Sequence, residues 1–379
     1  MENSIHKWGK SVLATGIFIA FLGTILALPA CQSEQGITAF MGSHKDTNDW
    51  YIVSMNEDGS GQVELTRWPS VGNHRQCWSR DGTLAYIEWT EGEPLAWLNV
   101  VDLDCNHRSR VLDLSGVNVE SISISPDGKT VLLACVAIPK INRPPDVKPN
   151  AMISNHWDLY VVDVVTGTLN QLTDTTDIRE INAVFSPDGR KIAFFGKTGD
   201  PQTYYDIYVM DSDGKNQRRL TNNDGSMILH DRSLQWSPDS RKILFSMDNV
   251  FIDDTTHYGD IFVTDVAKGS LANLTSSPDA DDAEACWAPN GKKIAFTSGR
   301  STDYGIWIMD ADGRNAVKVQ DSITQPSWLP DSKRIIAVHR VSERVYAVVT
   351  IDTEGKNMKT LIEGGDKYSA TYYPIWLSQ

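Results

Sequence analysis

The sequence predicts an all-β protein, a seven-bladed β-propeller of four-stranded antiparallel blades, and three observations support this fold class. The first is a motif in which an apolar residue precedes Ser-Pro-Asp-Gly or a close variant, and its six copies begin at Trp78, Ile124, Phe185, Trp236, Trp287 and Trp328. The second is a segment that closes each repeat, and its seven copies end at Thr66, Asp113, Thr173, Thr221, Thr275, Lys318 and Ile362. The third is one unmatched strand at residues 373–377.

The copy at residues 183–221 shows the order of elements within one repeat. Its first strand ends at Phe185, and Pro187-Asp188-Gly189 follows as a tight turn, because proline sets φ, aspartate caps the turn and glycine accepts a positive φ. The next three strands are expected at residues 191–195, 206–210 and 218–221. The Asp-Ser-Asp-Gly segment before the last strand is interpreted as a hairpin turn, since its glycine does not match the spacing of a calcium-binding EF-hand loop.

The two ends of the repeat region predict how the ring closes. The chain enters mid-repeat, on a second strand near residues 37–40, and leaves on a lone first strand at residues 373–377. We therefore expect the C-terminal strand to complete and close the first blade. Residues 37–379 supply about 49 residues for each blade, which suits a propeller repeat. The aromatic residues before the turns are expected to wedge between neighbouring blades.

The repeat resembles the TolB-type propeller repeat. The resemblance rests on Ser-Pro-Asp-Gly followed by Ile-Ala-Phe, then Ile-Tyr-Val-Met-Asp-Ser-Asp-Gly, then Arg-Leu-Thr, all within residues 183–221. It implies the fold and says little about function. TolB has six blades and a separate N-terminal α/β domain, whereas this sequence has seven units, so the partners of TolB are not carried over to particular residues.

Residues 1–30 resemble the signal peptide of a bacterial lipoprotein. Two lysines precede an uncharged apolar run at residues 11–28, and Leu-Pro-Ala then leads into Cys31. The resemblance implies that Cys31 carries a lipid and anchors an exported protein on the periplasmic or extracellular side of a membrane. An uncleaved membrane anchor stays open as an alternative. The expected organisation is a signal peptide at residues 1–30, a lipidated tether at residues 31–36 and a propeller at residues 37–379.

Composition and motifs exclude several classes of function. The chain is 41% hydrophobic with a formal net charge of −14, and it lacks the clustered lysines and arginines that nucleic acid requires. It also lacks a Gly-x-Ser-x-Gly elbow, a His-Glu-x-x-His motif and a phosphate-binding loop. No catalytic residue and no cofactor are therefore expected.

Four cysteines follow Cys31, at positions 77, 105, 135 and 286. They show no zinc-like spacing, and Cys77 and Cys286 each precede a tryptophan at equivalent places in the repeat. We expect small buried thiols. A disulfide stays open, because the expected compartment is oxidising.

The long connections between predicted strands all lie at one end of the ring, which is where function is expected. They occupy residues 42–49, 138–158, 197–205, 222–232, 248–259 and 276–284. The binding residues expected on this end are His74, Arg75, His156, Arg179, Glu180, His230, Asp231, His257 and Glu284. A metal site is not expected, because no two of these histidines share a tight ligand spacing.

The favoured function is that of a protein- or peptide-binding scaffold in the cell envelope, held at the membrane by its lipid. The alternative is an enzyme or glycan-binding module that acts on polysaccharide through the same end of the propeller. In that alternative, acid–base chemistry would fall to residues among His74, Arg75, His230, Asp231, His257 and Glu284.

Overall fold

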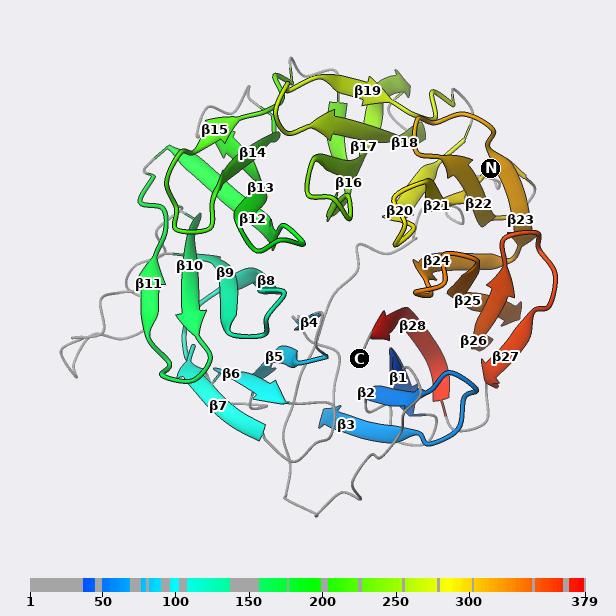
Figure 1. Cartoon of the computed structure of the whole chain (residues 1–379), viewed down its shortest axis with the longest axis horizontal. Coiled ribbons are helices and arrows are strands. Elements are labelled where there is room, and N and C mark those ends of the chain that lie inside the picture. The colour runs from blue at the N-terminus through cyan, green and yellow to red at the C-terminus, as the bar shows by residue number, and fades with distance from the viewer. Residues whose placement is uncertain are drawn as a thin grey trace, which may run out of the picture.

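A computed structural model confirms the predicted fold class. Seven four-stranded antiparallel sheets stand side by side in a ring, as Figure 1 shows. The structure describes residues 37–44, 50–68, 76–79, 82–89, 96–101, 108–136, 157–175, 177–198, 204–223, 227–253, 256–277, 280–301, 303–342, 345–363 and 368–377. The expected signal peptide, lipidated Cys31 and tether lie outside these residues. Within the described ranges, no helix is long and apolar enough to cross a membrane.

The blades are numbered along the chain, and the strands of each blade run from the innermost to the outermost. Blade 1 holds β28 (Tyr368–Leu377), β1 (Ile37–His44), β2 (Trp50–Asn56) and β3 (Val63–Trp68). Blade 2 holds β4 (Gln76–Trp78), β5 (Leu84–Trp89), β6 (Ala96–Val101) and β7 (Arg108–Asp113). Blade 3 holds β8 (Val119–Ile124), β9 (Thr130–Val136), β10 (Trp157–Asp163) and β11 (Leu169–Gln171).

The remaining blades repeat the same order. Blade 4 holds β12 (Ile178–Phe185), β13 (Lys191–Thr198), β14 (Asp206–Asp211) and β15 (Arg218–Arg219). Blade 5 holds β16 (Met227–Trp236), β17 (Lys242–Asp253), β18 (Thr256–Asp265) and β19 (Leu271–Asn273). Blade 6 holds β20 (Asp282–Trp287), β21 (Lys293–Ser298), β22 (Gly305–Asp310) and β23 (Val317–Asp321). Blade 7 holds β24 (Ile323–Trp328), β25 (Arg334–Ser342), β26 (Val345–Asp352) and β27 (Lys359–Ile362).

The predicted closure of the ring by the C-terminal strand is also confirmed. β28 pairs antiparallel with β1, from Ile37 opposite Leu377 to His44 opposite Tyr368. The seam between blades 7 and 1 carries further contacts, since Arg334 pairs with Glu57 and the Lys359 ammonium donates to the Asp58 carbonyl at 3.2 Å. First and last segments of the propeller therefore meet in one sheet and across one seam.

The Pro-Asp-Gly segments form the predicted tight turns. In blade 4, the Ser186 hydroxyl donates to Asp188 Oδ1 at 2.6 Å, and the backbone N–H of Arg190 donates to the same oxygen at 3.1 Å. Gly189 takes the positive φ of 69° that such a turn needs. The turn of blade 4 also touches that of blade 5, because the Asp188 N–H donates to Ser240 Oγ at 3.2 Å.

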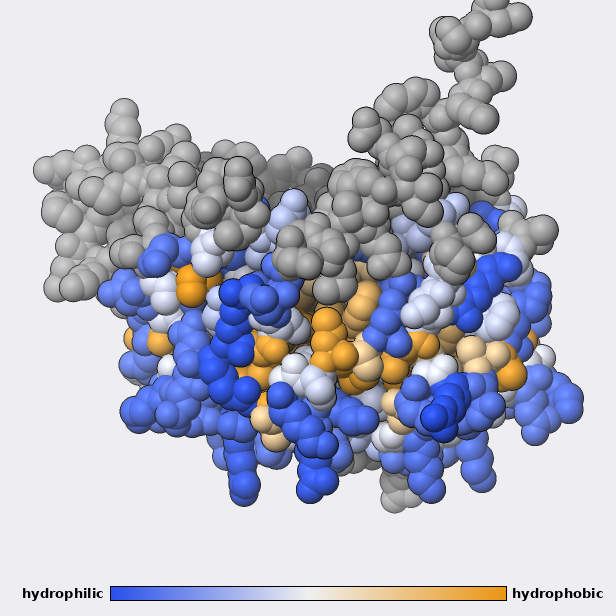
Figure 2. All heavy atoms as spheres, turned by 90° about the horizontal axis from the view of Figure 1, so that it is seen from above, coloured by the Kyte–Doolittle hydropathy of each residue, from blue (hydrophilic) through white to orange (hydrophobic). Residues whose placement is uncertain are grey.

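The aromatic residues before the turns pack between blades, as predicted. Trp236 of blade 5 is buried among side chains of blade 4, and its indole N–H donates to the Val184 carbonyl at 3.2 Å. Trp328 of blade 7 makes the same bond to the Cys286 carbonyl of blade 6. Figure 2 shows the ring edge-on, with hydrophilic residues at one end and apolar residues across the middle of the side in view. The hydrophobic core is thus divided among the seams between neighbouring blades, and the innermost strands surround the central axis.

Cys77, Cys135 and Cys286 are free thiols, and Cys135 is fully buried. The Cys286 thiol donates to the Pro326 carbonyl of the next blade at 3.1 Å, and burial raises its pKa to about 12. Cys105 lies outside the described residues. The described cysteines therefore act as small packing residues.

Candidate functional site

The candidate site is the end of the ring where innermost strands begin and outermost strands end, which we call the long-loop end. Six of the nine predicted binding residues lie at places where side chains are not described. His74, Arg75 and His156 fall outside the described residues, and only the backbone is described for His230, Asp231 and His257, in β16 and β18. The side chains of Arg179, Glu180 and Glu284 are described in full.

Glu180 lies in the seam between blades 3 and 4 and is fully buried. The Thr175 hydroxyl donates to its Oε1 at 3.2 Å, and the Thr173 hydroxyl donates to its Oε2. Burial raises the pKa of the Glu180 carboxyl to about 7, and the negative charge of Asp158 adds to the increase. This carboxyl therefore holds its proton to a higher pH than an exposed glutamate does, and it is shielded from solvent.

Arg179 precedes Glu180 in β12 and is only partly buried. Its guanidinium lies over the ring of Trp157, 4.8 Å from the ring centroid. Trp157 opens β10 and is the second-last residue of 138–158, the longest predicted insertion. The pair therefore ties the start of blade 4 to the point where that insertion returns to the sheet.

A repeated aspartate–threonine pair supports this end of the ring in blades 4 and 5. In blade 4, the Thr221 hydroxyl accepts from the Ile207 N–H at 2.9 Å and donates to Asp206 Oδ1 at 2.8 Å. The Asn223 N–H donates to the same carboxylate at 2.8 Å. In blade 5 the equivalent contacts join Ile261, Thr275, Asp260 and Ser277. Each pair fastens the start of the third strand to the chain that leaves the fourth.

These pairs were missed in the sequence, although their signal was present. An aspartate lies in the third strand in Asp-Leu-Tyr-Val, Asp-Ile-Tyr-Val and Asp-Ile-Phe-Val, at Asp158, Asp206 and Asp260. The fourth strand then ends in Leu-Thr in the same blades. Aspartate and threonine thus recur together at fixed places within the repeat, and this pattern would have indicated that the two side chains are in contact.

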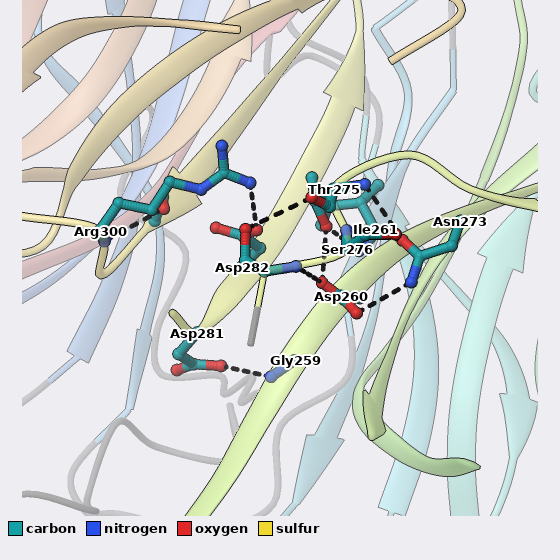
Figure 3. Close-up of polar contacts among 11 residues, drawn as sticks. Gly259, Asp260, Ile261, Asn273, Thr275, Ser276, Asp281, Asp282 and Arg300 are labelled. Carbon is teal, nitrogen blue, oxygen red and sulfur yellow. Dashed lines mark hydrogen bonds and ion pairs between the residues drawn. The ribbon is translucent and has the colours of Figure 1, made fainter. Parts of the chain in front are cut away.

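An ion pair with a buried carboxylate lies at the seam between blades 5 and 6, as Figure 3 shows. Asp282 is fully buried, and Arg300 Nη2 lies 2.6 Å from its Oδ2. The Arg300 guanidinium also lies over the rings of Phe296 and Trp307, at 5.5 and 5.4 Å from their centroids. Burial raises the pKa of the Asp282 carboxyl, and the arginine opposes that increase.

Asp281 connects blade 5 to blade 6 at the same seam. Its Oδ1 accepts from the Gly259 N–H at 3.1 Å, and its Oδ2 accepts from the Tyr304 hydroxyl at 3.0 Å. Gly259 belongs to β18 of blade 5 and Tyr304 directly precedes β22 of blade 6, so the carboxylate bridges the two blades; Figure 3 shows its bond to Gly259. Burial raises the pKa of the Tyr304 hydroxyl, which stays protonated and can donate.

Glu284 links blade 6 to blade 7 on the innermost strands. Its Oε2 accepts from the Thr297 hydroxyl at 2.7 Å and from the Gln325 N–H at 3.0 Å. Glu284 and Gln325 both have positive φ, at 53° and 57°, as has Asn182 at the equivalent position of β12. A non-glycine residue in this region is strained, so these bulges are held by the surrounding contacts.

The described side chains at the long-loop end are thus engaged in holding blades and loops. Within the described part of the chain, no group of three His, Cys, Asp or Glu residues could hold a metal ion. The arrangement offers a rigid platform with partly exposed arginine and tyrosine side chains at its surface. The binding role of the nine predicted residues stays a prediction.

Comparison with known proteins supports the fold. The family model of the TolB beta propeller domain matches residues 235–375. An uncharacterised protein of Agrobacterium fabrum is 28% identical over 165 residues, 39% of this chain and 50% of its own length. Dipeptidyl-peptidase 5 of Porphyromonas gingivalis is 24% identical over 302 residues, 70% of this chain and 42% of its own length. The chain therefore spans about half the length of these relatives.

Solved structures share the fold at low sequence identity. A prolyl endopeptidase has a TM-score of 0.65 at 15% identity, with 89% of this chain and 49% of that chain covered. Oligogalacturonate lyase in complex with manganese has a TM-score of 0.58 at 16% identity, covering 79% and 81%. TolB from Acinetobacter baumannii has a TM-score of 0.50 at 18% identity, covering 90% and 82%. The seven observed sheets make this chain a β-propeller, and residues 235–375 are similar to the TolB beta propeller domain.

Proposed function

We propose that this propeller is an exported scaffold, lipid-anchored through Cys31, that binds a protein or peptide partner in the cell envelope. One observation carries the proposal: the two ends of the ring are built differently. The turn end repeats one short turn whose carboxylate accepts from a serine hydroxyl and a backbone N–H of the same turn, whereas the longest predicted connection, residues 138–158, belongs to the other end. Variable loops on a rigid scaffold are a common basis for recognition.

The described contacts support a platform that is rigid before a partner arrives. Asp281, Asp282 and Glu284 each connect two blades or two connections at the long-loop end. A preorganised surface binds with a smaller loss of conformational entropy. We assign Glu180 and Glu284 to positioning, because both carboxylates accept hydrogen bonds within the fold, and we place Arg179 with the partner-contacting residues.

Site-specific photo-crosslinking tests where the partner binds. A benzophenone amino acid is placed at Tyr204 or Arg340, two exposed positions at the long-loop end, and at Lys215 or Lys356, two exposed positions on the turns at the other end. Irradiation of intact cells should give a discrete crosslinked product from the first pair only. Products from the turn positions alone would contradict the proposal. Glycan cleavage by the purified protein without any crosslink would favour the polysaccharide-acting alternative.

The lipid anchor is tested separately. Cells that express the wild-type chain or Cys31→Ser are fed an alkyne-labelled fatty acid and then fractionated. The wild-type protein should take up the label and sediment with membranes, and the variant should do neither. Label retained in Cys31→Ser would exclude this cysteine as the lipidation site, and Cys105→Ser serves as the matched control for loss of a thiol.

A further inference from the structure

The outer strand of blade 2 has an open edge on the side of the ring, away from the long-loop end. β7 runs from Arg108 to Asp113 and, among the described strands, pairs with β6 alone. The outer strand of blade 1 has the same six residues, whereas those of blades 3 to 7 are shorter, at three, two, three, five and four residues. Short edge strands deter pairing with other chains, so a longer edge with exposed residues is a place where a further strand can add.

Two arginines lie in one row on this strand. The guanidinium of Arg108 lies over the ring of Tyr86, 5.5 Å from its centroid, and that of Arg110 lies over the ring of Trp97 at 5.3 Å. Arg110 also lies 3.5 Å from the buried carboxylate of Glu88, with about half of its side chain exposed. Aromatic faces thus hold two exposed positive charges in place on a chain whose net charge is −14.

The strand also borders a hollow of about 350 Å³ between β7 and the turn that follows β10 in blade 3. Its lining is mixed: Val100, Val111, Val164 and Val165 share it with Ser109, Arg110, Thr166 and Gly167. Val165 is 87% exposed, which is unusual for a large apolar side chain. The register of β6 and β7 shifts between Leu98 and Asn99 and skips Val111, so the regularly paired part of β7 covers Arg108 to Arg110.

We infer that the edge of β7 binds an extended acidic peptide segment of a partner protein as a fifth strand of blade 2. Side chains alternate along a strand, so one set of peptide side chains would lie beside Arg108 and Arg110 and the other set above the hollow. Charge complementarity therefore specifies carboxylates at alternate positions, and the size of the hollow specifies small aliphatic residues between them. This site is separate from the long-loop end and does not depend on the function proposed for it.

Fluorescence anisotropy with a labelled peptide of alternating glutamate and valine tests the inference on the purified propeller. The peptide should bind, and binding should weaken at high salt, because the charge pairs lie at the surface. A peptide of the same length with lysine in place of glutamate should bind at least tenfold more weakly. A glutamate–valine peptide methylated on its backbone nitrogens should also bind at least tenfold more weakly, since it cannot complete the strand ladder. Equal binding of the methylated peptide would overturn strand addition.

Charge reversal tests the arginine row directly. The double variant Arg108→Glu and Arg110→Glu should no longer bind the acidic peptide and should bind the lysine peptide instead. The control double variant Arg190→Glu and Arg314→Glu, at exposed turns elsewhere, should bind both peptides as the wild type does. Circular dichroism checks that the charge-reversed variant is folded. If that variant is unfolded, the double variant Arg108→Gln and Arg110→Gln is used instead, and it should bind the acidic peptide at least tenfold more weakly than the wild type. Val165→Asp should weaken binding of the acidic peptide independently. Unchanged binding in a folded arginine variant, or self-association of the propeller without peptide binding, would refute the inference.

Discussion

The two ends of the propeller use the same residue type in opposite environments. At the turn end, Asp127 and Asp239 are exposed, and hydrogen bonds from Ser125 and Ser237 lower the pKa of their carboxyls. At the long-loop end, Glu180 and Asp282 are fully buried, and burial raises the pKa of their carboxyls. The turn carboxylates bond to groups two residues away, whereas the buried ones reach a neighbouring strand or blade.

This difference indicates which carboxylates contribute most to the stability of the fold. A carboxylate at an exposed turn is solvated in the folded and unfolded states alike, so it contributes little. A buried carboxylate lacks water, and removal of its partner leaves an uncompensated charge. We therefore expect substitutions at the long-loop end to cost far more than equivalent changes at the turns.

The largest effect is expected when the buried ion pair of blade 6 is broken. Asp282→Asn leaves the Arg300 guanidinium without its carboxylate, and we expect the free energy of unfolding to fall by about 4 kcal/mol. Urea denaturation measures this change. The matched control is Asp312→Asn at the turn end, where Arg314 lies 3.7 Å away and both side chains are exposed. A loss no larger than that of the control would show that the buried pair does not contribute more.

The second effect is a change in pH dependence. The pKa of Glu180 is about 7 in the folded protein and near 4.5 in the unfolded chain, so its contribution is complete below pH 4.5 and is lost as pH rises through 7. Glu180→Gln removes this slope. The unfolding free energy of the wild type minus that of the variant should therefore fall by about 3 kcal/mol between these pH values. A difference that stays constant from pH 4.5 to pH 8 would contradict the raised pKa.

The third effect tests the aspartate–threonine pair. Thr221→Val removes the hydroxyl that accepts from Ile207 and donates to Asp206, so a buried N–H loses its partner. We expect a loss of about 2 kcal/mol in urea denaturation. Thr166→Val at the turn of blade 3 is the control, because its hydroxyl bonds to Asp163 in the exposed region. Equal losses in the two variants would remove the distinction between the ends.

The smallest effect is expected at a Pro-Asp turn. Asp239→Ala removes the acceptor for the Ser237 hydroxyl and the Arg241 N–H, yet the loss should stay below about 1 kcal/mol because solvent replaces these bonds. The lowered pKa of Asp239 means that its contribution is present above pH 3.8 and is lost as pH falls through the folded value. Thermal unfolding at pH 7 and pH 3 should show a larger difference between wild type and variant at pH 7.

Much of the fold was predictable because its signals are local. Each repeat carries its own alternating strands and its own Ser-Pro-Asp turn, and the count of repeats together with the unpaired strand at residues 373–377 predicted seven blades and the closing pair of β1 and β28. The long-loop end was predictable only in part, because residues 248–259, expected as a connection, mostly continue the antiparallel ladder of β17 and β18. The Asp281–Tyr304 bridge was not predictable, because its partners come from different repeats and no local pattern joins them.

The sequence by itself determined the number of blades, the tight turns and the strand that closes the ring, since turn chemistry and two-residue periodicity act over a few neighbouring residues. Only the tertiary structure decided which carboxylates are buried and what they bond. Glu180 depends on Thr173 of the preceding blade, and Glu284 on Gln325 of the following one. Burial is a property of the seam between two blades, so it exists only after both have packed.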